Sequence, residues 1–379
     1  MNTIDFKKEN ITISILVLLW IVLQFIVSKN FTMRTSFDSE LYIAGAENIL
    51  NGRYPTGREL FYSTYMFILA ALAFLNLEPE SVIYVHFLAS IIALLATYRL
   101  VKKITNHQST ATFAVFLYII WFKFLQWNLI VYTDALFSHM VIISVYTLFI
   151  ARNAKQKVGA FVLILCTCLL RPTGVGLLVA TTIYFVNTAV QARNFRFYQK
   201  FTALIFVTFL LFLLLNQVLV HFIDSFIESY QMAEIIYPKV KVFINEPSSL
   251  YIPGKDKPAL IKLFLFIVMN PIYFLKISAM KGLLFIGHIK PYYSLFHNIV
   301  IASFLYPIYL LAIKGYFAMN EHHLKQLFFS FIAFQFLTVS LTSENWDGRF
   351  LLPILPLTFI LSSVGLFSYL NKKVVTNDI

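Results

Sequence analysis

The chain has 379 residues, of which 59% are hydrophobic and only 13% are charged, and its mean hydropathy is +0.76. Soluble domains carry roughly 25% charged residues, so this composition excludes an ordinary soluble protein and indicates an integral membrane protein with several spans. The formal charge of +12 forms no basic stripe on a soluble domain, which argues against nucleic acid as a partner.

Apolar runs that fit membrane-spanning helices recur along the chain. Ten runs are predicted as spans: Ile11–Ser28, Ser81–Leu100, Ala111–Leu125, Ala135–Ile150, Val158–Leu170, Val175–Val190, Phe201–Val220, Phe296–Ile313, Leu327–Leu341 and Leu351–Leu370. A further run, Phe61–Leu77, is ambiguous. All six basic clusters between the runs can face the cytoplasm only if this run does not cross the bilayer.

We therefore predict an all-α polytopic membrane protein with about ten transmembrane helices, within a range of about 9–12, and with both termini in the cytoplasm. Residues 1–379 form a single integral membrane domain in this interpretation, placed in the cytoplasmic membrane of a bacterium. The longer polar segments then lie outside, namely a first outer loop at 29–80 with juxtamembrane helices and a segment at 221–295 between spans. Function is expected on this outer face, because the extra chain lies there.

The first outer loop contains the polar stretch FDSELYIAGAENILNG. We expect a short helix on the outer membrane surface, with Asp38 as its N-cap and Gly52 just past its end. Asp38 either only caps this helix or acts as a general base that accepts a proton from a bound hydroxyl group. Glu40 is a metal ligand, a second base or a solvated surface charge, and the last of these is favoured.

Other polar residues stand near the predicted helix ends. Asp134, in VYTDALF, either caps the following helix or has a catalytic role, and His139 lies about one turn further on, where it would line a polar cavity. Arg171, in LLRPTG, and Arg349, in ENWDGRF, are either interface anchors or phosphate ligands. A guanidinium group suits phosphate oxygens through paired hydrogen bonds, and Arg349 is the preferred candidate.

The segment HIKPYYS joins the long outer segment to the next span. Lys290 and Tyr293 in this segment either meet a phosphate and a sugar ring or serve as interface anchors. No phosphate-binding glycine loop, nucleophile elbow or dinucleotide fingerprint occurs in the sequence, so no nucleotide site is predicted.

The order of these motifs resembles the GT-C superfamily of membrane glycosyltransferases, which includes protein O-mannosyltransferases and the lipid A aminoarabinose transferase. The motifs are the first-loop Asp followed by LYIAGAENILNGRYP, then VYTDALF, LLRPTG and DGRFLLPILP. Asp38 matches the catalytic Asp of the first loop, and Asp134 matches the acidic residue that opens the helix after the second outer loop. Individually the motifs are unspecific, and their order points to the superfamily without selecting a branch.

The resemblance implies a polyprenyl-phosphate sugar as donor, a hydroxyl on a glycan, lipid or protein as acceptor, and transfer with inversion. Two departures bear on a metal: Ser39 separates Asp38 from Glu40, and the chain ends at YLNKKVVTNDI without the large soluble domain of the oligosaccharyltransferase branch. We predict no cofactor, and a divalent metal is not predicted.

Two alternatives to this function remain open. One is a transporter or flippase of a lipid-linked glycan, which would favour ionisable residues buried in mid-span and broken helices. The other is a glycan polymerase or ligase with a similar number of spans. The lipid bilayer is the one partner that all of these interpretations share.

Overall fold

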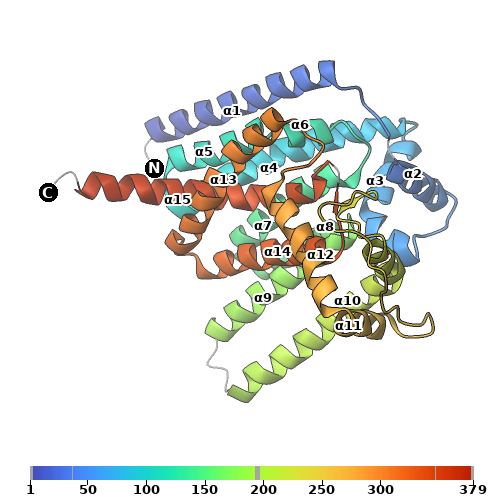
Figure 1. Ribbon diagram of the computed structural model, residues 1–379. Coiled ribbons are helices and arrows are strands. Elements are labelled where there is room, and N and C mark those ends of the chain that lie inside the picture. The colour runs from blue at the N-terminus through green and yellow to red at the C-terminus, as the bar shows by residue number, and fades with distance from the viewer. Residues whose placement is uncertain (1–2, 36, 193–196, 346, 377–379) are drawn as a thin grey trace. The chain divides into compact units, whose positions relative to one another are not determined.

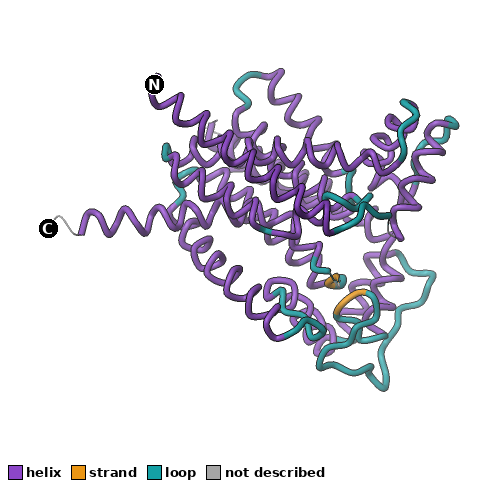
Figure 2. Tube along the Cα trace, turned by 90° about the horizontal axis from the view of Figure 1, so that it is seen from above, coloured by secondary structure: helices purple, strands orange, loops and turns teal. Residues whose placement is uncertain are grey.

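The computed structural model describes residues 3–35, 37–192, 197–345 and 347–376, and these residues are almost entirely helical (Figure 1, Figure 2). The longer helices are α1 (Thr3–Asn30), α2 (Phe37–Leu50), α3 (Ser63–Phe74), α4 (Val82–Thr105), α5 (Gln108–Ile120), α6 (Phe122–Trp127), α7 (Thr133–Ile150), α8 (Ala154–Cys168), α9 (Val175–Ala192), α10 (Phe197–Gln231), α11 (Ala259–Met269), α12 (Pro271–Gly287), α13 (Leu295–Ala318), α14 (His322–Leu341) and α15 (Leu355–Thr376). Short 3₁₀ turns are η1 (Gly57–Tyr62), η2 (Pro79–Ser81), η3 (Pro172–Gly174) and η4 (Arg349–Ile354). In the described part of the chain, the strands β1 (Ile236–Tyr237) and β2 (Glu344–Asn345) form one short parallel pair.

Six helical segments in the described ranges are long and apolar enough to cross a membrane. They correspond to α1, α4, α7, α13, α14 and α15, the last together with η4, and each overlaps a predicted span. The prediction of an all-α membrane protein is therefore confirmed, whereas the total of about ten spans stays a prediction. α11 and α12 meet the same criterion together but are bent by 103°, and they lie inside the segment 221–295 that was placed outside the membrane.

Two local features refine the predicted spans. The run Ala111–Leu125 is interrupted at Trp121, whose extended backbone (φ −73°, ψ 93°) separates α5 from α6. In the run Phe61–Leu77, α3 has 12 residues and is therefore about 18 Å long, shorter than the roughly 30 Å of a hydrocarbon core. That this run does not cross the bilayer stays a prediction, and the length of α3 agrees with it.

The chain forms two compact units. The first unit comprises Met1–Gly174, Tyr306–Lys325 and Leu352–Ile379, and the second comprises Val175–Leu305 and Gln326–Leu351. The single membrane domain predicted over residues 1–379 stays a prediction.

In the first unit, α4 lies at the centre and contacts α5 and α7, while α5 also contacts α1 and α15. In Figure 1, α1, α4, α5 and α15 run alongside one another. The last part of α13 approaches α15 closely, because Gly315 and Gly365 leave no side chain between the two backbones. Ser362 strengthens this crossing by donating its Oγ to the carbonyl of Ile308 at 2.8 Å. Small residues at such crossings are typical of helix packing in membranes.

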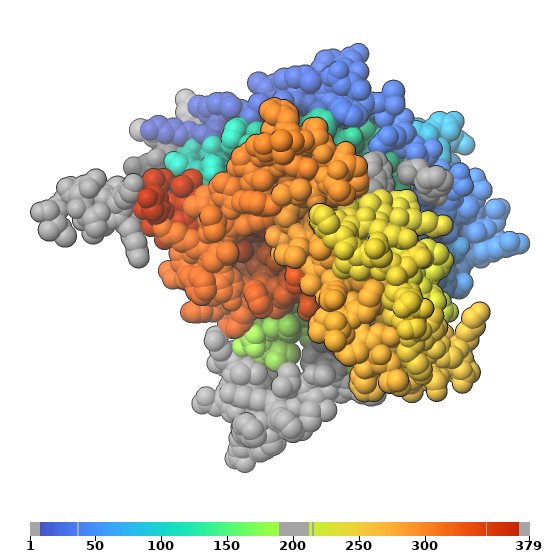
Figure 3. All heavy atoms as spheres, in the orientation of Figure 1, coloured from blue at the N-terminus to red at the C-terminus, as the bar shows by residue number. Residues whose placement is uncertain are grey.

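The second unit has a core where the end of α10 meets β1, α11 and α12. Tyr230 is fully buried there, with its ring 5.5 Å from that of Phe266 and stacked 5.4 Å from that of Phe274. Its hydroxyl bonds to Ser278 at 2.8 Å and to the carbonyl of Leu341 at 3.0 Å. In Figure 3 the yellow atoms of the segment after α10 lie directly against the orange atoms of α11 and α12, as this core requires.

Candidate functional site

The start of α2 is joined to the segment that follows α6. The amide of Arg34 donates to the carbonyl of Leu129 at 3.2 Å, and the amide of Val131 donates back to the carbonyl of Arg34 at 3.1 Å. The Oγ of Ser39 donates to the carbonyl of Val131 at 2.6 Å. These bonds hold the two segments side by side. They also position Asp38, which lies between Arg34 and Ser39.

Asp38 lies in the first turn of α2, which begins at Phe37, and its side chain is half-buried. It therefore does not occupy the expected N-cap position, and its Oδ2 accepts a hydrogen bond from the hydroxyl of Tyr132. The N-terminus of a helix favours a negative charge at this point. Glu40 is exposed on the same turn.

The far end of α2 follows the prediction for Gly52. This residue has a φ of +76°, and the amide of Arg53 donates to the carbonyl of Asn48 at 2.8 Å while the amide of Gly52 donates to that of Ile49 at 3.0 Å. Such paired bonds are the Schellman motif that ends a helix. The short helix is therefore well defined at its C-terminal end as well.

A cluster of tyrosine rings centres on Tyr42 and includes Tyr132, the partner of Asp38. Tyr42, one turn further along α2, is 1% exposed, and its ring lies 5.2 Å from Tyr62, 5.3 Å from Tyr65 and 5.6 Å from Tyr132. The last two contacts are edge-to-face, a favourable geometry for aromatic rings. These contacts pack the ring of Tyr42 against three other tyrosine rings.

The electrostatics of Tyr42 link two of the predicted site residues. Burial is the main reason why the pKa of the Tyr42 phenol lies well above its ordinary value, and the neighbouring tyrosines and Asp38 raise it further. The charge of Arg171 acts in the opposite direction. Asp38 and Arg171 therefore both lie within electrostatic reach of the same phenol.

Arg171 forms an ion pair with Asp134 across 37 residues of sequence. Asp134 is fully buried in the first turn of α7, and Arg171, at the start of the turn before α9, is 6% exposed. The Arg171 guanidinium also lies 5.9 Å from the ring centre of Phe137. The two predicted site residues are thus brought together, and Asp134 fixes the orientation of the guanidinium.

His139 was predicted to line a polar cavity, and it is completely buried. Its Nδ1 lies 2.5 Å from the hydroxyl of Tyr118, and its Nε2 lies 2.8 Å from the Oδ1 of Asn128. Both ring nitrogens are therefore engaged with other protein groups.

The second unit holds the remaining predicted site residues. Lys290 pairs with Glu344 at 3.2 Å, and both side chains are completely buried. Burial raises the pKa of the Glu344 carboxyl, and the Lys290 ammonium opposes this shift. Asn298 holds the Lys290 segment in place, since it accepts from the Lys290 amide at 3.1 Å and donates to its carbonyl at 3.0 Å.

Tyr293 lies near Glu344, and Arg349 lies at the start of the turn that follows β2. Tyr293 stacks on His297 with ring centres 4.2 Å apart. Burial, with smaller contributions from Asp347 and Glu344, raises the pKa of the Tyr293 phenol to about 12. Arg349 opens η4, is half-buried, and has its guanidinium 5.3 Å from the ring centre of Phe350.

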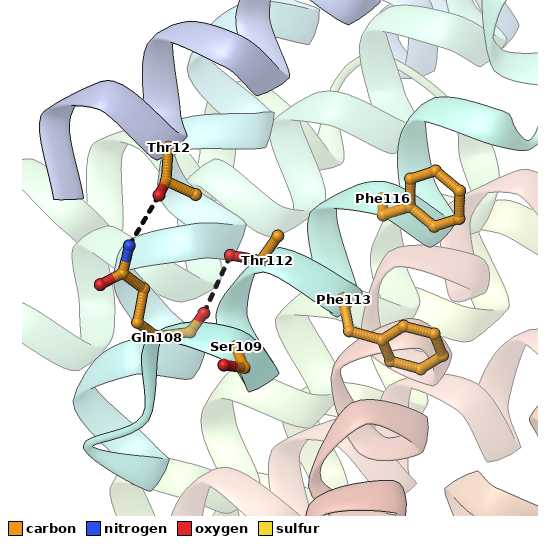
Figure 4. A pocket seen from close by; sticks show the side chains of 6 residues that line it. All are labelled: Thr12, Gln108, Ser109, Thr112, Phe113 and Phe116. Carbon is orange, nitrogen blue, oxygen red and sulfur yellow. Dashed lines mark hydrogen bonds between the residues drawn. The ribbon is translucent and has the colours of Figure 1, made fainter. Parts of the chain in front are cut away.

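A surface hollow of about 470 Å³ lies elsewhere in the first unit (Figure 4). It is lined by Thr12, Gln108, Ser109, Thr112, Phe113 and Phe116. The Nε2 of Gln108 donates to the Oγ1 of Thr12 at 2.7 Å in this hollow. Thr12 is near the start of α1, about 27 Å of helix away from Asn30, and Asp38 follows the end of that helix. The hollow is therefore separate from the site around Asp38.

In the described residues, no group of three or more His, Cys, Asp or Glu side chains is arranged to hold a metal ion. No family model, curated protein or solved structure matches this chain. The fold defines an all-α membrane protein, and the first unit contains a half-buried carboxylate bound to a tyrosine and a buried arginine–aspartate ion pair.

Three residues at these sites were not singled out from the sequence. Tyr132, which binds Asp38, stands two residues before Asp134 in a segment that was already noted. Tyr42 stands one turn after Asp38 in α2, and Glu344 precedes Asp347 in SENWDGRF. The pairs that these residues form join distant segments, and such pairs leave no pattern in the local sequence.

Proposed function

We propose that this protein is an inverting glycosyltransferase that moves a sugar from a polyprenyl-phosphate donor to an acceptor hydroxyl. The site would face outward from a bacterial cytoplasmic membrane, with both chain termini inside. One observation carries the proposal: the half-buried carboxylate of Asp38 is bound by Tyr132, which stands two residues before Asp134, the partner of the buried Arg171. A base and a cation in one unit are the two groups that such a transfer needs.

In the proposed reaction, the acceptor oxygen attacks the anomeric carbon on the side opposite the phosphate. Asp38 takes the hydroxyl proton, the new glycosidic bond forms, and the bond to the phosphate oxygen breaks with its electron pair. The phosphate leaves as an anion, so no general acid is needed, in contrast to the paired carboxyls of glycosidases. Asp134 acts by orienting Arg171, since the two form a buried ion pair.

Positive charge must meet the developing charge on the phosphate; the proposal assigns this role to Arg171, and Arg349 stays the candidate that the sequence favours. We expect Arg349→Ala to weaken use of the donor more than Arg349→Lys, because lysine keeps the charge but lacks the planar pair of donors. Losing a charge-assisted hydrogen bond costs roughly 1.5–3 kcal/mol, which is about 10- to 150-fold in kcat/KM. The check is a titration of donor at a fixed acceptor concentration, and equal kcat/KM in all three proteins would remove Arg349 from the site.

The experiment that tests the function uses purified protein in detergent with a panel of synthetic polyprenyl-phosphate sugars. Delipidated cell-envelope glycan, lipid and protein fractions serve as acceptors, and release of free polyprenyl phosphate is measured by mass spectrometry. The proposal expects release that requires both one donor and one acceptor fraction. Absence of release with every donor, from protein shown to be folded by its elution and thermal unfolding, would reject the proposal.

A second candidate, a transporter or flippase of a lipid-linked glycan, is favoured by the bend between α11 and α12. The two helices meet at 103°, and Lys281 in α12 is completely buried, with its ammonium 4.1 Å from the ring centre of Tyr230 and bound to the carbonyl of Thr342. Broken helices and buried charges are common at transport sites. Transfer in detergent separates the two functions, because transport needs a sealed membrane and sugar transfer does not.

A further inference from the structure

A chain of buried hydrogen bonds holds Asn128, the first residue of the segment 128–132 that contacts Asp38. It joins α1, α3, α4, α5 and α7 to the residue that follows α6. Its members are Gln24, Tyr65, His86, Tyr118, Asn128 and His139. Each of these side chains is at most 3% exposed. The network is therefore closed to solvent, and its bonds can be assigned one after another.

Main-chain carbonyls fix the direction of the first bonds, because a carbonyl only accepts. Gln24 donates its Nε2 to the carbonyl of Leu125 at 3.1 Å, so its Oε1 accepts from the Nδ2 of Asn128 at 3.0 Å. The Oδ1 of Asn128 then faces His139 at 2.8 Å, which makes Nε2 of His139 the donor. The remaining nitrogen of His139 accepts from the hydroxyl of Tyr118 at 2.5 Å.

His86 reaches the same asparagine from the other side. Its Nδ1 lies 3.1 Å from the main-chain carbonyl of Asn128 and must donate to it. Its Nε2 then accepts from the hydroxyl of Tyr65 at 3.3 Å. Complete burial favours the neutral imidazole, and in that form the two histidines have opposite tautomers, each using one ring nitrogen to hold Asn128.

Asn128 begins the segment 128–132 that carries the contacts to α2. This segment bonds to Arg34 and Ser39 through its main chain, and it ends with Tyr132, whose hydroxyl binds Asp38. We propose that Asn128, clamped by His86 and His139, is a positioning residue that sets Tyr132 against Asp38. The position of Tyr132 against Asp38 is inferred from geometry alone. The effect of Asn128 on sugar transfer rests in addition on the proposed function.

A network that only stabilises the helix bundle would behave differently from one that positions Tyr132. Buried polar groups nearly always have partners, so the network would also exist if it only stabilised the helix bundle. In that case any lost bond would act in the same way, whichever residue lost it. A positioning role predicts instead that only the bonds to Asn128 matter for the segment 128–132.

Amide side chains separate the two kinds of bond. Glutamine places its amide near the position of Nε2 of a histidine, and asparagine places its amide near that of Nδ1. His139→Gln therefore keeps the donor to Asn128, whereas His139→Asn keeps only the acceptor for Tyr118. At residue 86 the order is reversed: His86→Asn keeps the bond to Asn128, and His86→Gln keeps the one to Tyr65. At each histidine, the Asn variant and the Gln variant each lose one buried hydrogen bond, so each is the matched control for the other.

The test measures amide hydrogen exchange and sugar transfer on the four purified full-length variants. We expect exchange in peptides covering 129–132 to be at least roughly 10-fold faster in His139→Asn and His86→Gln, with little change in His139→Gln and His86→Asn. Transfer should follow the same crossed order, with kcat about 10-fold lower and KM within about twofold, because small misplacements cost rate more than binding.

Exchange decides the positioning role even if the wild-type protein transfers no sugar, in which case only the proposed function fails. Equal exchange in both members of each pair, or faster exchange spread evenly over the chain, would overturn the inference. A crossed order in exchange without one in kcat of an active enzyme would also overturn its catalytic part. If one variant fails to insert, the pair at the other histidine gives the same comparison.

Discussion

Replacement of Asp38 by asparagine is expected to leave a folded, membrane-inserted protein with sugar transfer reduced by at least roughly 10²-fold, the low end of the effect of a lost general base. Asparagine has the same shape, and its carbonyl oxygen still accepts the hydrogen bond from Tyr132. It cannot accept a proton at neutral pH, which is the one property that the mechanism requires. Since α2 begins before Asp38, its start does not depend on this side chain as a cap.

Two further variants make this result specific. Asp38→Glu keeps the charge but moves it by about one methylene, so it should recover only part of the rate. Glu40→Gln is the matched control, because Glu40 is an exposed carboxylate on the same helical turn, and its transfer should stay within about twofold of wild type. Wild-type turnover by Asp38→Asn in the purified system would reduce Asp38 to a surface residue of a short helix.

Much of the helical framework could be predicted from hydropathy alone. The runs that became α1, α4, α7, α13, α14 and α15 are long and apolar, and their boundaries were placed within a few residues of the observed helices or inside them. The break at Trp121 was missed because IIWFKF contains neither Gly nor Pro. The bend at Asn270 has a clear local signal, a proline at the first position of α12, but the segment had been taken as polar. Tertiary packing, not local propensity, determines a break such as the one at Trp121.

The site was predicted residue by residue but not as a set of contacts. Asp38, Asp134 and Arg171 were recognised because charged side chains are rare in this chain and stand near helix ends. That Arg171 pairs with Asp134 depends on how α7 and the turn before α9 lie in space, over 37 residues of sequence. The Lys290–Glu344 pair depends equally on a long-range approach. Single sequences contain no signal for such distances, and only a three-dimensional structure supplies it.

The buried pair of Arg171 and Asp134 leads to the largest expected effect on stability. Asp134 is completely buried, so Arg171→Met would leave a carboxylate without its partner in a place that water does not reach. Breaking a buried pair from one side costs about 3–5 kcal/mol, a large fraction of the stability of most domains. We expect a strongly reduced yield of monodisperse protein and a lower midpoint of thermal unfolding in detergent.

The double variant Asp134→Asn, Arg171→Met is the decisive control, because it removes both charges at nearly constant side-chain size. Replacing both partners of a buried pair is often close to neutral, so most of the lost stability should return. If Arg171 also meets the phosphate, the stable double variant should still transfer sugar poorly, which separates the structural role of the pair from its chemical one. An Arg171→Met protein as stable as wild type would show that the pair is not a buried ion pair in the folded protein. A double variant that is stable and fully active would leave Arg349 as the remaining phosphate ligand of the proposal.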